Sequence, residues 1–281
     1  PIWVCSRRWP DVEIVRDIHL VTRDMVRSWS RKYLGITEVH VWSGFPCTDL
    51  SGVKANRENL WGKNSRLFYE VPRVTNLVKE EFGTEVTVKE VVENVASMDE
   101  TAAREISEEL GMYPYRLDPV QAVPMRRPRF CWTSETLEGV CPDVRVESGR
   151  YWREVIAEAP YPEIGQWIDD GFRWEGGERG CVLPTCLKAI PRRTPPPRPA
   201  GLQKCDWDTC ERWRSDCFRY PPYQYQEQFL FTSDSSWRLV NANEKELLLG
   251  YGYRHTEVAW SASRIKQDRV GYSDARNSYM G

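Results

Sequence analysis

Hydrophobic and polar positions alternate along residues 11–20 (DVEIVRDIHL), a period of two that predicts a β-strand. Residues 22–35 (TRDMVRSWSRKYLG) have helical spacing instead, with Thr22 as the expected N-cap and Gly35 as the expected end. The same two periods continue as far as residue 134. They predict strands at 38–45, 84–95, 113–123 and 126–134, and helices at 65–83 and 99–111.

This alternation predicts an open α/β sheet with helices on both faces. Ligands of such sheets bind beyond the carboxyl ends of the strands. Cys47 follows one of these ends, and Glu93 and Asn94 lie at the next. We therefore expect these side chains to share one edge of the sheet.

The pattern changes after residue 135. Turn residues, aromatic residues and charges mix without a clear period to about residue 236, and 191–199 form a basic, proline-rich stretch. A helical pattern returns in 237–252, with Asn243 as the expected cap. We predict an α/β domain at 1–134, an inserted irregular domain at 135–236 and a return to the first domain at 237–281.

Charge and composition narrow the candidate functions. The 281 residues carry a net charge of −2, so any contact with nucleic acid must come from local basic patches. No apolar run approaches the roughly 18 residues of a membrane span.

Nine cysteines at irregular spacing favour a reducing compartment, the nucleus or the cytoplasm. The pairs Cys181/Cys186 and Cys205/Cys210 lie at the loose limit of zinc-ligand spacing. Free thiols are the preferred interpretation, so we expect no metal.

The candidate chemistry begins with Cys47, which follows Pro46 at a strand-to-loop turn. It is either a nucleophile or a structural cysteine, the commoner fate of a single thiol. The carboxylate of Glu93 needs a partner if it is desolvated. Arg127 and Arg129 are two apart, so on a strand they share a face that could hold this carboxylate.

Several blocks together resemble a known family, the DNA cytosine-5 methyltransferases. They are GFPCTDLSG (44–52), NSRLFYEVPRV (64–74), VVENV (91–95), VPMRRPRF (123–130) and WRLVNANEKELLLGYGYRHT (237–256). The resemblance covers about 10–134 and 237–281 and is closer to animal-type enzymes. It implies a Rossmann-like S-adenosylmethionine-dependent methyltransferase sheet, in which 135–236 is an inserted target recognition domain.

Two departures qualify the resemblance. Met125 replaces a glutamine of the family's arginine block. The glycine-rich first block and the acidic residue for the cofactor ribose are absent, so we expect an internal fragment whose sheet is incomplete at the N-terminus. Such a fragment is expected to bind the cofactor weakly and to be inactive by itself.

The resemblance also implies roles for individual residues. Cys47 would add to C6 of a flipped-out cytosine in double-stranded DNA, and Glu93 would bind the base at N3 and its amine. Asn94 would position the loop around Pro46, and Arg129 with Arg127 would contact O2. The cofactor contacts would be Asp17, Ile18, Pro46 and Leu67, and the DNA contacts Ser51, Lys54, Arg57, Arg192 and Arg193.

Two alternatives stay open. The tRNA-directed branch of the same family shares the Pro-Cys and Glu-Asn-Val blocks, although residues 48–51 (TDLS) fit the DNA branch better. A non-catalytic, methyltransferase-like regulator typically loses the cysteine or the glutamate, and both are present here. Membrane binding is not expected, whereas partner proteins could bind through flanking regions.

Overall fold

The computed structural model describes residues 5–6, 8–52, 56–121, 123–136, 143–146, 151–156, 168, 171–178, 181–187, 189–190 and 192–251. The chain divides into two compact units. The sheet unit comprises Ile14–Asp118 and Pro128–Glu158, and the C-terminal unit comprises Pro1–Glu13, Pro119–Arg127 and Ala159–Gly281. The three-part domain division expected from the sequence stays a prediction.

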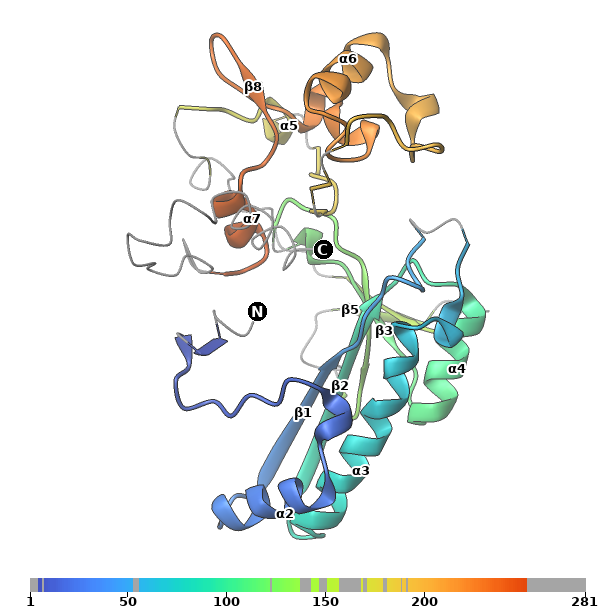
Figure 1. Ribbon diagram of the computed structural model, residues 1–281, viewed down its shortest axis with the longest axis vertical. Helices are drawn as coiled ribbons and strands as arrows, with labels where there is room; N and C mark the ends of the chain where they lie inside the picture. The colour runs from blue at the N-terminus through green and yellow to red at the C-terminus, as the bar shows by residue number, and fades with distance from the viewer. Residues whose placement is uncertain are drawn as a thin grey trace. The chain divides into compact units, whose positions relative to one another are not determined.

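A mixed six-stranded sheet forms the sheet unit, in the order β1-β2-β4-β3-β6-β5 (Figure 1). The parallel pairs are β1 with β2 and β3 with β6, and the remaining neighbours are antiparallel. The strands are β1 (Glu38–Gly44), β2 (Thr87–Val95), β3 (Tyr115–Leu117), β4 (Arg129–Thr133), β5 (Asp143–Val146) and β6 (Arg153–Ile156). The predicted α/β class is confirmed, and the sheet extends beyond residue 134 through β5 and β6.

Among the described residues of this unit, the α-helices are α2 (Arg23–Lys32), α3 (Glu70–Phe82) and α4 (Glu100–Leu110). Thr22 caps α2 as predicted, and Asp99 caps α4 by accepting from the Ala102 amide. The 3-10 helix η3 (Ser65–Tyr69) leads into α3, and Gly83 follows α3 with φ +78°, a value that favours glycine. The predicted helices at 22–35, 65–83 and 99–111 are therefore confirmed.

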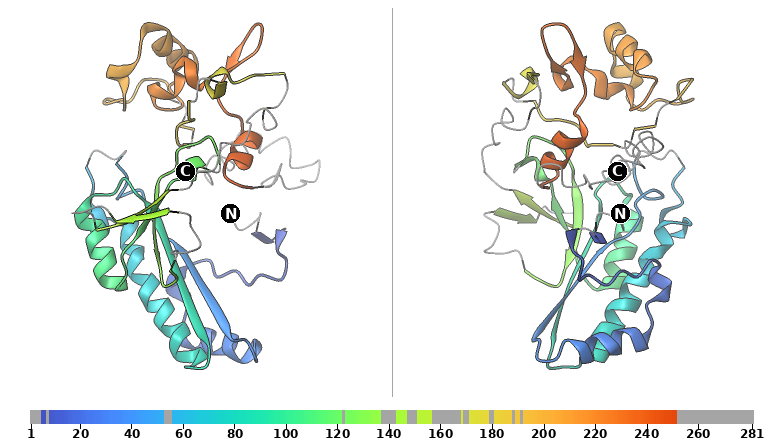
Figure 2. Two further views of the ribbon diagram at one scale, coloured as in Figure 1. Left: turned by 180° about the vertical axis from the view of Figure 1, so that it is seen from behind. Right: turned by 60° about the vertical axis from the view of Figure 1, so that its left-hand side comes forward.

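The core of the sheet unit lies between one sheet face and helices α3 and α4, which follow the same side of the strands in Figures 1 and 2. Val92 of β2 and Trp132 of β4 are paired in register and fully buried. Ile106 of α4 and Phe68 of η3 complete this cluster. Because α2 packs on α3, the described helices of the unit lie on one face, whereas helices on both faces were expected.

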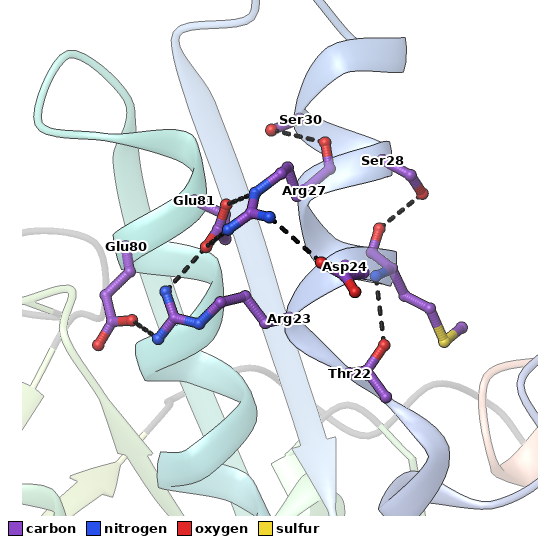
Figure 3. Close-up of polar contacts among 9 residues, drawn as sticks. Thr22, Arg23, Asp24, Arg27, Ser28, Ser30, Glu80 and Glu81 are labelled. Carbon is purple, nitrogen blue, oxygen red and sulfur yellow. Dashed lines mark hydrogen bonds and ion pairs between the residues drawn. The ribbon is translucent and has the colours of Figure 1, made fainter.

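Ion pairs join α2 to α3 at the surface (Figure 3). Glu81 of α3 accepts from Arg23 at 2.8 Å and from Arg27 at 2.9 Å. Hydrogen bonds from Arg27, then from Arg23, hold the pKa of Glu81 below its ordinary value despite the opposing effect of burial. This carboxylate therefore links the two helices most strongly while it is ionised.

The predicted strand at 11–20 is wrong. The described chain there is irregular and then forms the 3-10 helix η1 (Ile18–Leu20). The Asp17 side chain accepts from the His19 amide at 3.0 Å, which favours a turn over an extended strand. Val12 and Leu20 are more than half exposed, so the alternating pattern corresponds to no buried face.

The predicted strand at 113–123 is shorter than expected. Only β3 is extended, and the 3-10 helix η4 (Pro119–Gln121) follows it. Pro119 has no amide hydrogen, so it cannot donate to a sheet ladder at that point.

The C-terminal unit contains short elements around a smaller core of Met125, Trp174, Leu183, Cys186, Phe231 and Leu248. They are α5 (Glu175–Glu178), η6 (Leu202–Lys204), α6 (Trp207–Ser215), η7 (Pro222–Tyr225), η8 (Glu227–Phe229), β7 (Phe231–Thr232), β8 (Trp237–Arg238) and α7 (Ala242–Leu248). Asn241 caps α7 in a reciprocal capping box with Glu244, so the predicted cap at Asn243 is wrong by two positions. Helix α6 was not predicted.

No described helix combines the length and the apolar character that a membrane crossing requires.

Candidate active site

Strands β1 and β2 end together, and their ends define the candidate site. They run parallel, with Gly44 opposite Glu93 in the register. The Asn94 side chain is buried, and its amide donates to the Phe45 carbonyl at 2.9 Å. Since Phe45 precedes Pro46 and Cys47, this bond fixes the start of the cysteine loop against β2. Glu93 and Asn94 therefore lie at the same end of the sheet as the start of the cysteine loop, and a shared role with the Cys47 side chain stays a prediction.

Glu93 projects from the sheet face opposite to the helices. Its Oε1 lies 2.5 Å from Nε of Arg129, the first residue of β4, and its side chain is 46% exposed. Gly44 of the neighbouring strand adjoins this carboxylate, since a Cβ there would be in ordinary van der Waals contact with Oε2 of Glu93, at 3.5 Å. The site therefore presents a carboxylate that is held by a guanidinium and open to solvent.

The thiol of Cys131 lies on this face. Cys131 is paired in register with Glu93, and burial, with a smaller contribution from the Glu93 charge, raises its pKa to about 11. Cys131 is therefore protonated near neutral pH and a poor nucleophile.

Cys47 begins a tight turn. Its carbonyl accepts from the amides of Leu50 at 3.0 Å and Ser51 at 2.9 Å. The residue is half-buried and packs against the core cluster of the sheet unit. The side chain is thus anchored and still reached by solvent, as a nucleophile must be.

The loop after Cys47 is pinned by a residue whose role the sequence did not reveal. Asp49 is 3% exposed, and its Oδ2 accepts from the amides of Asn64 at 2.9 Å and Ser65 at 3.2 Å. Gly62 is needed for this approach, because a Cβ there would lie 2.4 Å from Oδ2 of Asp49. The buried carboxylate therefore ties the loop to η3.

The predicted DNA contacts fall in different places. Ser51 follows the cysteine turn, and the Arg57 guanidinium lies beside Gly52 in the same loop. Lys54 lies outside the described residues. Arg192 and Arg193 are exposed on the C-terminal unit.

A cavity of about 280 Å³ lies beside the end of β1. It is lined by three of the four predicted cofactor residues, Ile18, Pro46 and Leu67, and otherwise mainly by apolar groups. Asp17 is the N-cap of η1, next to Ile18. The sequence thus identified one wall of a real cavity, from segments far apart in the chain.

Glu70 is the acidic group of this cavity and was not predicted as a site residue. Arg73 pairs with it at 2.5 Å and also donates to the carbonyls of Ile18 and Val21. The two side chains fasten the segment before α2 onto α3, and so hold the cavity wall in place.

Arg127 does not share a strand face with Arg129. Pro128, which lacks an amide hydrogen, separates it from β4, and it belongs to the C-terminal unit. In that unit its charge acts on Cys186: burial raises the pKa of the Cys186 thiol, and the positive charges of Lys245 and Arg127 oppose that rise.

The eight described cysteines are all free thiols. Within the described ranges, no three His, Cys, Asp or Glu side chains gather as a metal ion would require. Cys205 and Cys210 are close enough for their charges to interact, but no third ligand joins them among these residues.

No family model matches the chain. Among solved structures, a mutant of DNMT2 from Spodoptera frugiperda is similar at 10% sequence identity, with a TM-score of 0.49. The match covers 98% of this chain and 84% of that one. Similarity at this level does not establish a common activity.

Proposed function

We propose that the chain carries the catalytic machinery of a DNA cytosine-5 methyltransferase. The observation that supports this proposal is the end of β1 and β2, where Asn94 binds the carbonyl of Phe45, two residues before Cys47, and Arg129 pairs with Glu93. If Cys47 were only a structural residue and Glu93–Arg129 only a surface ion pair, nothing would require the buried Asn94 amide to fix the start of the cysteine loop.

The proposed reaction begins with the Cys47 thiolate, which forms a bond to C6 of cytosine and makes C5 nucleophilic. As charge develops on the ring, the Glu93 carboxyl group donates a hydrogen bond to N3 and accepts one from the exocyclic amine. Arg129 holds the Glu93 carboxylate in place and would contact O2 of the base. After C5 gains the methyl group, a base removes the C5 proton, and the C6–sulfur bond breaks to release Cys47.

The cavity beside β1 has mainly apolar walls and lies next to the cysteine loop, because Pro46 is part of that loop and also lines the cavity. A cofactor in this cavity would therefore lie close to Cys47. When bound, S-adenosylmethionine would supply an electrophilic methyl group. Ile18, Leu67 and Pro46 would hold it through apolar contacts, and Asp17 stands next to Ile18 as a hydrogen-bond acceptor for the adenine amine. The paired Glu70 and Arg73 would keep these walls together.

DNA as the substrate is supported by the Thr48–Ser51 segment and by exposed arginines at 57, 192 and 193. A base in a duplex must leave the stack before Cys47 reaches C6. Transfer to single-stranded or transfer RNA in preference to duplex DNA would favour the tRNA-directed alternative.

The direct test is methyl transfer, by the full-length protein that contains this chain, from labelled S-adenosylmethionine to duplex DNA that contains 5-fluorocytosine. Fluorine cannot leave C5 as a proton does, so a stable protein–DNA adduct should accumulate. Cys47→Ala should abolish the adduct. The control Cys217→Ala removes an exposed thiol of the other unit and should not affect it. An equal amount of adduct with Cys47→Ala would reject the proposed nucleophile.

A further inference from the structure

A cavity of about 480 Å³ lies within the C-terminal unit, and the proposed reaction gives it no role. Its walls come from the end of α6 and the segment that follows, from β8 and from the start of α7. Three of its side chains are cationic, Arg219, Arg238 and Lys245, and two are aromatic, Tyr220 and Trp237.

Lys245 is the unusual member of this lining. The residue is 5% exposed, although lysine is rarely buried without a partner. Its Nζ donates to the Tyr220 hydroxyl at 3.0 Å and lies 4.6 Å from the centre of the Tyr220 ring. No carboxylate among the described residues forms an ion pair with it. The hydroxyl occupies one of three N–H donors.

The other two cations of the lining have their own carboxylates. Arg238 makes a bidentate pair with the buried Glu244, at 2.7 and 2.6 Å. Arg219, half exposed, pairs with Asp216 at 3.4 Å. Among the described residues, Lys245 is therefore the one cation of this lining that has no ion pair. Burial of an unpaired charge is costly, and an anion in the cavity would offset that cost.

We propose that this cavity binds a phosphate group and that Lys245 is its principal ligand. A phosphate offers several oxygens to the remaining N–H donors of Lys245 and to Arg219 at the rim, and its charge matches the local excess. The Tyr220 hydroxyl accepts from the ammonium group and helps to orient it. The phosphate could belong to a free nucleotide or to a nucleic-acid backbone. This inference does not depend on the methyltransferase proposal.

The test compares the thermal stability of the whole chain in inorganic phosphate and in chloride at matched ionic strength. Phosphate should raise the melting temperature above the chloride value, because a ligand that binds only the folded state stabilises it. Lys245→Met should lose this difference and weaken phosphate affinity by about tenfold or more. Lys204→Met removes an exposed lysine of the same unit and should keep the difference.

Phosphorus NMR of inorganic phosphate with the wild-type chain provides a measurement that does not depend on how the variants fold. Line broadening that adenosine monophosphate reverses would assign the site to nucleotides, and reversal by duplex DNA alone would assign it to a backbone phosphate. Either result supports the site. Equal stability in phosphate and chloride, or an unchanged phosphate effect in a folded Lys245→Met variant, would overturn it.

Discussion

Asp49 offers the sharpest test of how the loop after Cys47 is held. Replacement by alanine removes the acceptor of two backbone amides, those of Asn64 and Ser65. Each buried donor left without a partner costs ~1–3 kcal/mol, so Asp49→Ala should lower the free energy of unfolding by about 4 kcal/mol. In a domain of this size that loss lowers the melting temperature by about 10 °C.

Urea denaturation followed by circular dichroism measures the effect, with two variants as references. Asp49→Asn keeps an oxygen acceptor and should lose about half as much stability. Asp24→Ala removes a carboxylate that is 89% exposed, and its effect should stay within about 0.5 kcal/mol. If Asp49→Ala unfolds at the same urea concentration as Asp24→Ala, the pinned loop is refuted.

Three further predictions follow from the same unit. Gly62→Ala should destabilise the fold at least as much as the loss of Asp49, because the new methyl group overlaps that carboxylate; a urea midpoint equal to the wild-type value would contradict this. Asn94→Ala should lower the yield of 5-fluorocytosine adduct per folded molecule, since it frees the backbone carbonyl that positions the cysteine loop. An unchanged yield per folded molecule would indicate a purely structural amide. Glu81→Gln should flatten the acid side of the stability profile. The pKa of Glu81 is lowered in the folded state, so its contribution is complete above its ordinary pKa of 4.5 and disappears as pH falls through the lowered value; an unchanged profile would argue against the Arg27 pair.

The local signals that predicted elements correctly are those with a short-range cause. The cap at Thr22, the terminal glycine at 83 and the β-branched run of β2 each act within a few residues. The strand predicted at 11–20 failed because its alternation has no buried face to match, and Asp17 forms a local turn instead.

Part of the candidate site could be predicted from the sequence, again from signals that act within a few residues. The Pro-Cys and Glu-Asn blocks lie at the ends of two strands whose pairing the α/β pattern implied. Asp49 and Glu70 were missed, since their importance arises from burial and from partners that are distant in the chain. Lys245 likewise reads as a surface lysine of an amphipathic helix until the structure places it against Tyr220.

The central claim is that the Cys47 thiolate adds to C6 of cytosine. Such an adduct makes C5 exchange its hydrogen with solvent, and this exchange requires no methyl donor. Duplex DNA labelled with tritium at cytosine C5 should therefore release tritium to water in the presence of the full-length protein that contains this chain. Cys47→Ala should abolish the release while Cys217→Ala preserves it. Tritium release that persists undiminished in Cys47→Ala, or none from the wild-type full-length protein, would contradict the account.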